Sequence, residues 1–462
     1  MAQGIRNVIG AGRALCRVAL PLGWAVIPAM AQSVALPASD PVGIARSGIQ
    51  VAYGYSLEAA SLNPALLASV PEGRSAFIAG GLEAQSAQTS LEASQQTWYS
   101  DDRNRAIGGL GAAFRLSPRL TLGLKVDTPF ERHGVFASDS PNRFLGDRLD
   151  LSGRRLEVQA AWAITPGLSI GVGLGVANLR FQSGTVLRAG IPLDPTQPAS
   201  TANPVDGVAE TAVAQNGSKT VPSYSLGLRW AINPRWTLGL AHQSSYRADL
   251  SLSAYDRGGL LGFYANDGLS PALLGTQPRA LALVGATSTL AGSGRLELPS
   301  LTTFGVRHRL NPMITWEADL RWTAPGLQVP SLPGLETPSG PVYSPAVGVR
   351  GKGHLGYGMS AEVALGKRWT LRAGGLVDRN AQDALNVEPL MGGSSQATFS
   401  AGAGYRVWGG ELSFGYQFRQ SQDQDVTNLN GVWSAGGYRS TGTRVRVEGM
   451  GHLLAIGFRR SF

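Results

Sequence analysis

The stretch LSIGVGLGV, residues 168–176, alternates large apolar side chains with very small ones. A second stretch, ITWEADLRW, residues 314–322, alternates apolar side chains with threonine, glutamate, aspartate and arginine. Successive side chains of a β-strand point to opposite faces, so each stretch predicts a strand with one apolar face. Charges on the second face in strand after strand are typical of a transmembrane β-barrel, whose apolar face contacts lipid.

Segments of this kind recur along the whole chain and predict a 14-stranded antiparallel transmembrane β-barrel. Short turns such as Ser117-Pro118-Arg119 and Asn311-Pro312-Met313 join neighbouring strands, and long connections separate the resulting hairpins. This alternation is typical of bacterial outer-membrane barrels, with short periplasmic turns and long extracellular loops. The predicted strands cover residues 73–86, 104–116, 119–129, 151–165, 167–182, 221–233, 235–253, 293–310, 312–323, 355–366, 368–379, 395–407, 409–421 and 448–462.

The alternative fold is a large soluble β-sandwich, which would have to bury many charged residues or expose a broad sheet. The end of the chain also favours an outer-membrane barrel, because apolar residues alternate up to the terminal Phe462. This ending resembles the assembly signal of outer-membrane barrels, so the outer-membrane assembly machinery is an expected partner. We therefore expect the protein in the bacterial outer membrane.

Residues 1–31 predict a signal peptide, with a basic leader, an apolar core and the small-residue site Ala29-Met30-Ala31. The only cysteine, Cys16, falls inside this segment, so the predicted mature chain has no disulfide. Residues 32–72 do not alternate and predict an N-terminal hatch that fills the lumen, because a barrel this wide otherwise holds an open channel. Residues 73–462 are then the barrel.

Several function classes are disfavoured by the composition. The net charge of +9 is spread along the chain, so nucleic acid is not an expected partner; outer-membrane lipid and lipopolysaccharide are. The histidines show no i, i+4 pair and the mature chain no thiol, so no metal site is expected. No Gly-x-Ser-x-Gly motif stands out as a nucleophile site, and the barrel accounts for the polar residues. We expect neither an enzyme nor a cofactor.

The triplet Asn63-Pro64-Ala65, which follows a Gly- and Ala-rich stretch, resembles the hatch motif of the FadL-type outer-membrane transporters. The stretches Asp127-Thr128-Pro129-Phe130, Leu296-Glu297-Leu298-Pro299 and Trp369-Thr370-Leu371-Arg372 also resemble stretches of that family. One departure is Asp378-Arg379-Asn380-Ala381, where the family often has Ser-Pro.

The resemblance implies passive uptake of hydrophobic compounds, most simply long-chain fatty acids, with hatch-gated lateral diffusion through the barrel wall. An aromatic-hydrocarbon importer of the same family is one alternative. A surface interaction protein, such as an adhesin or phage receptor, is another. Hydrophobic small molecules are the partners in the first two cases.

The resemblance to these transporters also implies a lateral opening in the wall and a capture groove in the loops. Asp127, Thr128 and Pro129 are the candidate strand kink, because proline has no amide hydrogen for the ladder; the alternative is that Pro129 merely ends the strand. The fourth long loop is unusually apolar, which favours a binding patch, although self-packing or an oligomer contact is also open. The candidate groove residues are Leu260, Leu261, Phe263, Tyr264, Leu269, Leu273 and Leu274.

A fatty-acid carboxylate in an apolar pocket needs a cation or several hydrogen-bond donors. Strand alternation places Lys125, Arg247, Arg321 and Arg372 toward the lumen as candidates. The alternative is an internal salt-bridge ladder with Glu317, Asp319, Asp127 and Asp249. The resemblance adds Arg180 and Arg188, although alternation points Arg180 outward.

Overall fold

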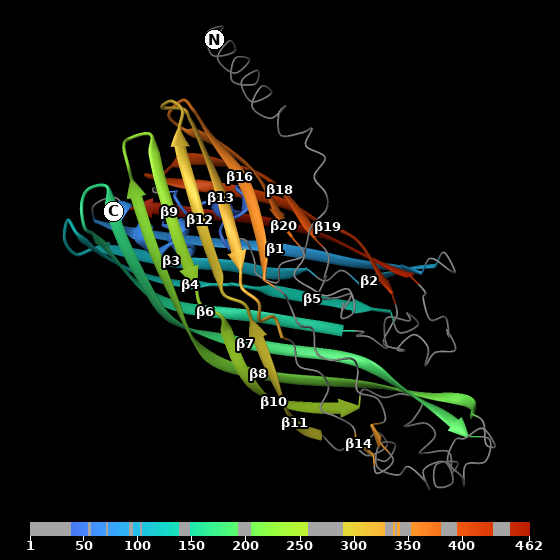
Figure 1. Cartoon of the computed structure of the whole chain (residues 1–462). Helices are drawn as coiled ribbons and strands as arrows, with labels where there is room; N and C mark the ends of the chain where they lie inside the picture. The colour runs from blue at the N-terminus through green and yellow to red at the C-terminus, as the bar shows by residue number, and fades with distance from the viewer. Residues whose placement is uncertain are drawn as a thin grey trace.

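A computed structural model gives the fold of the chain. Strand segments form one antiparallel sheet that closes on itself, because β1 pairs with β20 as well as with β3. The four consecutive pairs β2–β3, β4–β5, β9–β10 and β11–β12 each make one interrupted strand, so the barrel has 14 strands (Figure 1). The structure describes residues 38–53, 57–70, 73–91, 96–101, 104–137, 148–192, 205–256, 290–328, 336–337, 340–341, 353–379, 395–427 and 444–462.

The predicted antiparallel barrel is confirmed. Short turns lie at one end of the barrel and the long connections at the other (Figure 1); we call these the turn end and the loop end. The strands are β1 Arg74–Leu91, β2 Gln96–Asp101, β3 Arg105–Arg115, β4 Leu120–Asp127, β5 Glu131–Phe136, β6 Arg148–Ala163, β7 Leu168–Pro192, β8 Val205–Ala231, β9 Trp236–Gln243, β10 Tyr246–Asp256, β11 Leu290–Leu298, β12 Leu301–Arg309, β13 Ile314–Thr323, β16 His354–Leu365, β17 Trp369–Asp378, β18 Gln396–Val407, β19 Gly410–Thr427 and β20 Arg444–Ser461, with two-residue strands β14 Glu336–Thr337 and β15 Gly340–Pro341 forming a separate pair.

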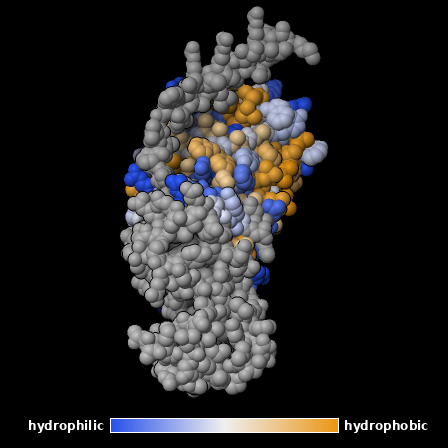
Figure 2. All heavy atoms as spheres, turned by 90° about the vertical axis from the view of Figure 1, so that its right-hand side faces the viewer, coloured by the Kyte–Doolittle hydropathy of each residue, from blue (hydrophilic) through white to orange (hydrophobic). Residues whose placement is uncertain are grey.

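The outer face of the barrel is apolar over its middle. On β7 the side chains of Ile170, Val172, Leu174 and Val176 are all at least two-fifths exposed, whereas Ser169 and Gly173, at alternate positions of the same strand, are buried. Figure 2 shows hydrophobic residues gathered on the described surface, with hydrophilic residues beside them. A solvent-exposed apolar face of this extent fits contact with lipid. No helix in the described ranges is long and apolar enough to cross a membrane.

The strands at the loop end are longer than expected. The predicted long connection 183–220 is wrong for most of its length, because β7 continues to Pro192 and β8 begins at Val205. Ladder pairs join the two strands along this extension, in one register as far as Gly190 and Val208 and with a shift before Pro192 and Val205. Beyond the bilayer both faces of a hairpin can meet water, so the apolar alternation that marks a membrane strand disappears while the hydrogen-bond ladder continues.

Two predicted strands, 235–253 and 293–310, are each interrupted in the structure. The first breaks at Ser244 and Ser245 between β9 and β10, and the second breaks at Pro299 and Ser300 between β11 and β12. Odd-numbered residues are buried below each break, and even-numbered residues are buried above it. An interruption of this kind shifts the alternation by one residue and turns the other set of side chains inward.

The N-terminal segment, residues 38–53 and 57–70, packs against the inner face of the barrel wall. It contains α2 Pro41–Ile44, η1 Glu58–Ser61 and η2 Pro64–Ser69. The helix α2 contacts β18, β19 and β20, whereas η2 contacts β4, β6, β7 and β8. The segment therefore reaches both sides of the barrel.

Candidate functional site

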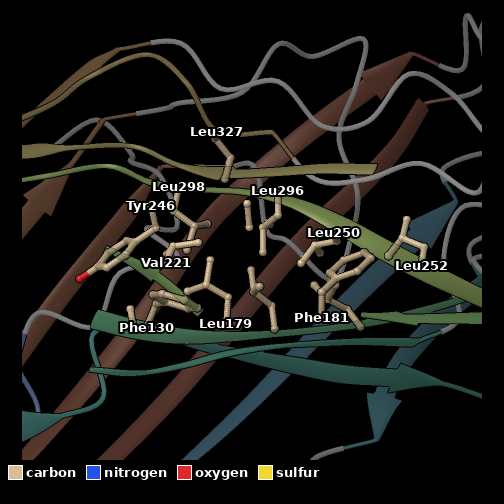
Figure 3. Packing of buried hydrophobic residues seen from close by; sticks show 14 of the residues in the cluster. Phe130, Leu179, Phe181, Val221, Tyr246, Leu250, Leu252, Leu296, Leu298 and Leu327 are labelled. Atoms are coloured by element: carbon tan, nitrogen blue, oxygen red, sulfur yellow. The ribbon is translucent and has the colours of Figure 1, made fainter. Parts of the chain in front are cut away.

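The lumen contains a large apolar cluster toward the loop end. Figure 3 shows its side chains pointing toward one another from β6, β7 and β8 on one side and from β10 and β11 on the other. Leu151, Leu179 and Leu296 are completely buried. We call this set the apolar cluster; it consists of Ala87, Phe130, Phe136, Leu149, Leu151, Ala177, Leu179, Phe181, Val221, Tyr246, Ala248, Leu250, Leu252, Leu296, Leu298 and Leu327.

The strand breaks place several members of the apolar cluster. Above the break at Ser244 and Ser245, Tyr246, Ala248 and Leu250 turn inward, and Arg247 turns outward. The rings of Phe130 and Tyr246 meet edge to face, with 5.7 Å between centroids. Sequence reasoning missed this cluster because it extended the lower alternation through the breaks. The available signal was the Leu-rich run on even positions of residues 246–252.

Below the apolar cluster lies a layer of paired charges, which we call the charged layer: Lys125, Asp127, Arg155 and Glu157. Arg155 donates to both carboxylate oxygens of Asp127, from Nε at 2.9 Å and from Nη2 at 2.6 Å. Lys125 Nζ lies 3.5 Å from Asp127 Oδ2 and 3.4 Å from Glu157 Oε1. All four residues are buried, and the two cations balance the two carboxylates. Because each cation of this layer already pairs with a carboxylate, the layer is a poor binding site for a further anion and opposes the passage of ions.

The triplet Asn63-Pro64-Ala65 forms the start of η2. Asn63 is fully buried, and its Oδ1 accepts from Ala65 N at 3.1 Å, which caps the short helix. Its Nδ2 donates to Val51 O at 2.7 Å and to Leu228 O of β8 at 3.1 Å. One side chain thus connects the two parts of the N-terminal segment to the wall.

Glycines let the wall approach this triplet. A Cβ added at Gly227 of β8 would lie 2.0 Å from Asn63 Oδ1. A Cβ added at Gly171 of β7 would lie 2.3 Å from Ala65 N. Glycine is therefore needed at both positions for the close approach of two backbones.

A second attachment involves Glu317 on β13. Arg46 is buried and its Nη2 lies 2.7 Å from Glu317 Oε2, while the Ala52 amide donates to Glu317 Oε1 at 2.7 Å. The guanidinium of Arg46 also stacks over the Tyr53 ring, 4.0 Å from its centroid. Tyr53 Oη donates to Glu362 Oε2 at 2.7 Å. Glu317 therefore holds the N-terminal segment at two adjacent points.

Asp40 caps α2 by accepting from Gly43 N at 2.7 Å. Burial, and to a smaller extent the nearby negative charge of Glu58, raises the pKa of Asp40 to about 6. The ionised form of this carboxyl is therefore disfavoured when the segment is docked.

The wall is interrupted beside Asp127, Thr128 and Pro129. In-register pairs between β3 and β4 end at Leu110 and Val126, and residues 105–109 of β3 have no ladder partner on β4 or β5 among the described residues. Side chains bridge the interval instead. Thr128 Oγ1 donates to Gly108 O at 3.3 Å, and Arg154 Nη2 of β6 donates to Ala106 O at 3.2 Å. Arg154 Nη1 also donates to Thr128 Oγ1.

The structure separates the predicted head-group cations. Lys125 belongs to the charged layer, and Arg372 pairs with Glu362 at 2.9 Å and Glu411 at 2.6 Å. Arg321 Nη2 donates to Gly48 O at 3.2 Å. The lumenal placement of Arg247 is wrong: its side chain is 71% exposed and pairs with Glu297, because the strand break reverses the alternation. Asp249 likewise faces out and pairs with Arg295.

Arg180 is exposed on the outer face of β7, as its alternation predicted. Arg188 lies on β7, but its side chain falls outside the described residues. The groove candidates Leu260, Leu261, Phe263, Tyr264, Leu269, Leu273 and Leu274 lie outside the described residues as well. No group of metal-ligating side chains occurs within the described ranges.

A cavity of about 760 Å³ opens at the turn end of the barrel. It is lined by the basic residues Lys367, Arg368, Arg406 and Arg459 and by the aromatic residues Tyr405 and Trp408. Arg459 also pairs with Glu58 of the N-terminal segment at 3.2 Å. The turn end is therefore polar, in contrast to the apolar cluster above.

The barrel is similar to solved outer-membrane transporters. A Pseudomonas aeruginosa FadL homologue is 16% identical with a TM-score of 0.71, over 93% of this chain and 100% of that chain. The Pseudomonas putida toluene transporter TodX is 14% identical with a TM-score of 0.58, over 92% and 99%. The Ralstonia pickettii toluene transporter TbuX is 15% identical with a TM-score of 0.56, over 92% and 99%. No curated protein sequence matches the chain.

Residues 25–462 match the family model described as outer membrane protein transport protein (OMPP1/FadL/TodX). The match spans nearly the whole chain, and the closed barrel agrees with it. The chain therefore belongs to the OMPP1/FadL/TodX family of transport proteins, β-barrels of the bacterial outer membrane that carry hydrophobic compounds.

Proposed function

We propose that the protein passes uncharged hydrophobic molecules, with monoaromatic hydrocarbons the favoured class, across the outer membrane by passive diffusion. The observation that carries this choice is the apolar cluster above a charged layer whose charges are already paired. A fatty-acid carboxylate would have to displace a carboxylate from Lys125 or Arg155, which leaves a buried charge unpaired at a cost of about 3–5 kcal/mol. TodX and TbuX, two of the similar structures, are toluene transporters.

The proposed route uses the apolar cluster as the binding region. A hydrophobic molecule gains roughly 25 cal/mol for each Å² of apolar surface that it removes from water there. The charged layer and the N-terminal segment stand below the cluster and oppose direct passage toward the periplasm. The interval between β3 and β5, bridged by side chains instead of a ladder, offers a sideways exit toward lipid.

In this proposal the N-terminal segment is a hatch. Its polar attachments to the wall include Asn63 to β8 and Glu317 of β13 to Arg46 and Ala52, besides Glu362 to Tyr53, Arg321 to Gly48 and Arg459 to Glu58. These contacts are directional, and in this proposal the segment shifts by breaking some of them while the ladders of the barrel stay intact. Asn63, Pro64 and Ala65 would then mark the contact that opens.

Uptake by living cells tests the substrate class. Cells that lack their own importer would be given labelled toluene or labelled oleate, with and without this protein. We expect toluene uptake to rise with the protein and oleate uptake to stay at background. Oleate uptake would replace the hydrocarbon assignment with the fatty-acid one. With the barrel folded in the outer membrane, no uptake of either compound would favour a surface interaction protein.

A pair of variants on one strand tests the binding region. Leu179→Asn places an amide in the apolar cluster, and an unsatisfied buried polar group costs about 1–3 kcal/mol. We expect toluene uptake to fall by roughly 5- to 150-fold. Arg180→Ala changes the neighbouring exposed residue and serves as the matched control. Equal uptake by the two variants would exclude the apolar cluster as the binding region.

A further inference from the structure

The wall of the barrel contains a second interval without a hydrogen-bond ladder, between β8 and β10. In-register pairs between β8 and β9 run up to Ser225 and Gln243, and Ser244 N still donates to Tyr224 O at 2.9 Å. Pairing between β8 and β10 resumes only at Asn216 and Ser253. Residues 217–223 and 246–252 all belong to the described part of the chain, yet no ladder pair joins them. We call this interval the β8–β10 seam.

The seam follows from the sequence of β9 and β10. Relative to β8, the break at Ser244 and Ser245 adds one residue to the strand formed by β9 and β10. The register shows this extra residue, since the numbers of paired residues sum to 468 below the seam (225 and 243) and to 469 above it (216 and 253). The extra residue disrupts the ladder, as in a β-bulge. On its other edge β10 keeps a regular ladder with β11 from Tyr246 to Ala254. The discontinuity is therefore confined to the β8 side.

The strands nevertheless stay close, and apolar side chains close the seam. A Cβ added at Gly217 of β8 would lie 3.4 Å from Leu250 Cβ and 3.0 Å from Leu252 Cδ2. The buried side chains of Val221 and Tyr246 at the seam belong to the apolar cluster (Figure 3), and so does Ala248. One side-chain hydrogen bond crosses the seam, from Lys219 Nζ to Asp249 O at 2.9 Å.

The seam lies where the outer surface changes character. Below it, Tyr224 and Leu226 are exposed on the apolar face. Alongside it, Ser218, Lys219 and Thr220 are exposed polar residues. The seam thus meets the outer edge of the bilayer. Backbone without a ladder at such a depth is tolerated where side chains or a cavity shield it.

We propose that the β8–β10 seam is a second lateral passage, through which uncharged hydrophobic molecules move between the outer leaflet and the apolar cluster. Opening of the seam itself, with the ladder from Asn216 and Ser253 onward left intact, breaks one side-chain hydrogen bond and apolar contacts. The interval between β3 and β5 differs, because two side-chain hydrogen bonds cross it, from Thr128 to Gly108 O and from Arg154 to Ala106 O. The seam is therefore the less costly path for a molecule without a charge. This inference rests on the proposed function.

A reversible cross-link tests the seam. Gly217→Cys with Leu250→Cys, in a Cys16→Ser background, places two Cβ atoms near the separation of about 3.5–4.5 Å found in disulfides. Oxidation would fix β8 to β10, and reduction would release them in the same protein. The matched control is Val172→Cys with Leu226→Cys, which join β7 and β8 across a regular ladder on the outer face, outside the seam and the apolar cluster.

Toluene uptake is measured for both pairs, reduced and oxidised. We expect oxidation to lower uptake at least tenfold in the seam pair and to leave the control pair within twofold. Equal uptake by the oxidised and reduced seam pair would overturn the second passage while leaving the proposed function intact. A lack of toluene uptake by the unmodified protein would overturn the proposed function itself, and the seam with it.

Discussion

The loop-end and turn-end halves of the lumen share several strands but have opposite chemistry. On β6, Leu149 and Leu151 belong to the apolar cluster, whereas Arg155 and Glu157 belong to the charged layer a few residues farther along. On β10, Tyr246 and Leu250 belong to the apolar cluster, whereas below the break Gln243 of β9 donates to Ser61 O of the N-terminal segment at 3.1 Å. The apolar half needs no specific partner for its side chains. The polar half is held by directional contacts, and those are the contacts that fix the N-terminal segment.

This difference predicts that replacing a polar residue that contacts the N-terminal segment changes leakage more than replacing a surface residue near the loop end. The largest effect is expected for Glu317→Ala, which leaves Arg46 buried without its carboxylate at a cost of about 3–5 kcal/mol. We expect hydrophilic solutes to leak through the reconstituted protein, because the N-terminal segment is released. Liposome swelling measures this leak.

Asp249→Ala is the control for Glu317→Ala, because it removes an exposed ion pair near the loop end. Exposed pairs contribute little to stability. Leakage equal in the two variants would show that the buried attachment does not hold the segment, and the contrast between the halves would lose its main support.

Leakage of hydrophilic solutes measured as a function of pH tests the docking of α2. The pKa of Asp40 is raised from 3.8 to about 6 in the folded protein, so the ionised form weakens docking. Docking is at full strength below about pH 4, weakens as the pH rises to about 6, and is constant above that. At about 1.4 kcal/mol for each pKa unit, the change is on the order of 3 kcal/mol. Leakage should rise over this range in the wild type and stay flat in Asp40→Asn.

Close approach of wall and segment predicts a further effect. Gly227→Ala places a Cβ against the side-chain oxygen Oδ1 of Asn63, and overpacking of this kind costs typically about 1–3 kcal/mol. We expect the leak to increase by roughly 5- to 150-fold. Gly80→Ala is the control, since an added Cβ there has no neighbour within 4 Å. An unchanged leak in Gly227→Ala would mean that the segment does not rest on β8 as tightly as the geometry indicates.

The smallest effect is expected at the interval between β3 and β5. Arg154→Ala removes the guanidinium that joins Thr128 to Ala106. A hydrogen bond to a charged group contributes about 1.5–3 kcal/mol, and solvent screening lowers this figure for the exposed Arg154. We expect toluene uptake to rise a few fold if the interval is an exit, with Arg180→Ala unchanged. Slower uptake in Arg154→Ala would contradict a closing role for the arginine.

The alternation in stretches such as residues 168–176 determined the barrel, its antiparallel order and its outer apolar face. Each of those properties depends on a period of two residues within a single strand, and that period is visible in the sequence. The position of Asn63-Pro64-Ala65 at a helix start also follows from local chemistry, because asparagine and proline favour the first turn.

Only the tertiary structure decided which side chains meet in the lumen. A two-residue break at Ser244 and Ser245 reverses the face of every residue that follows, so it turned Arg247 outward and Tyr246 inward. The partners of Arg46, at Glu317 and Ser360, lie far away in the sequence and meet it only because the barrel closes around the segment. The sequence determined the strands from their own alternation, whereas the contents of the lumen depend on register between strands, which no single strand encodes.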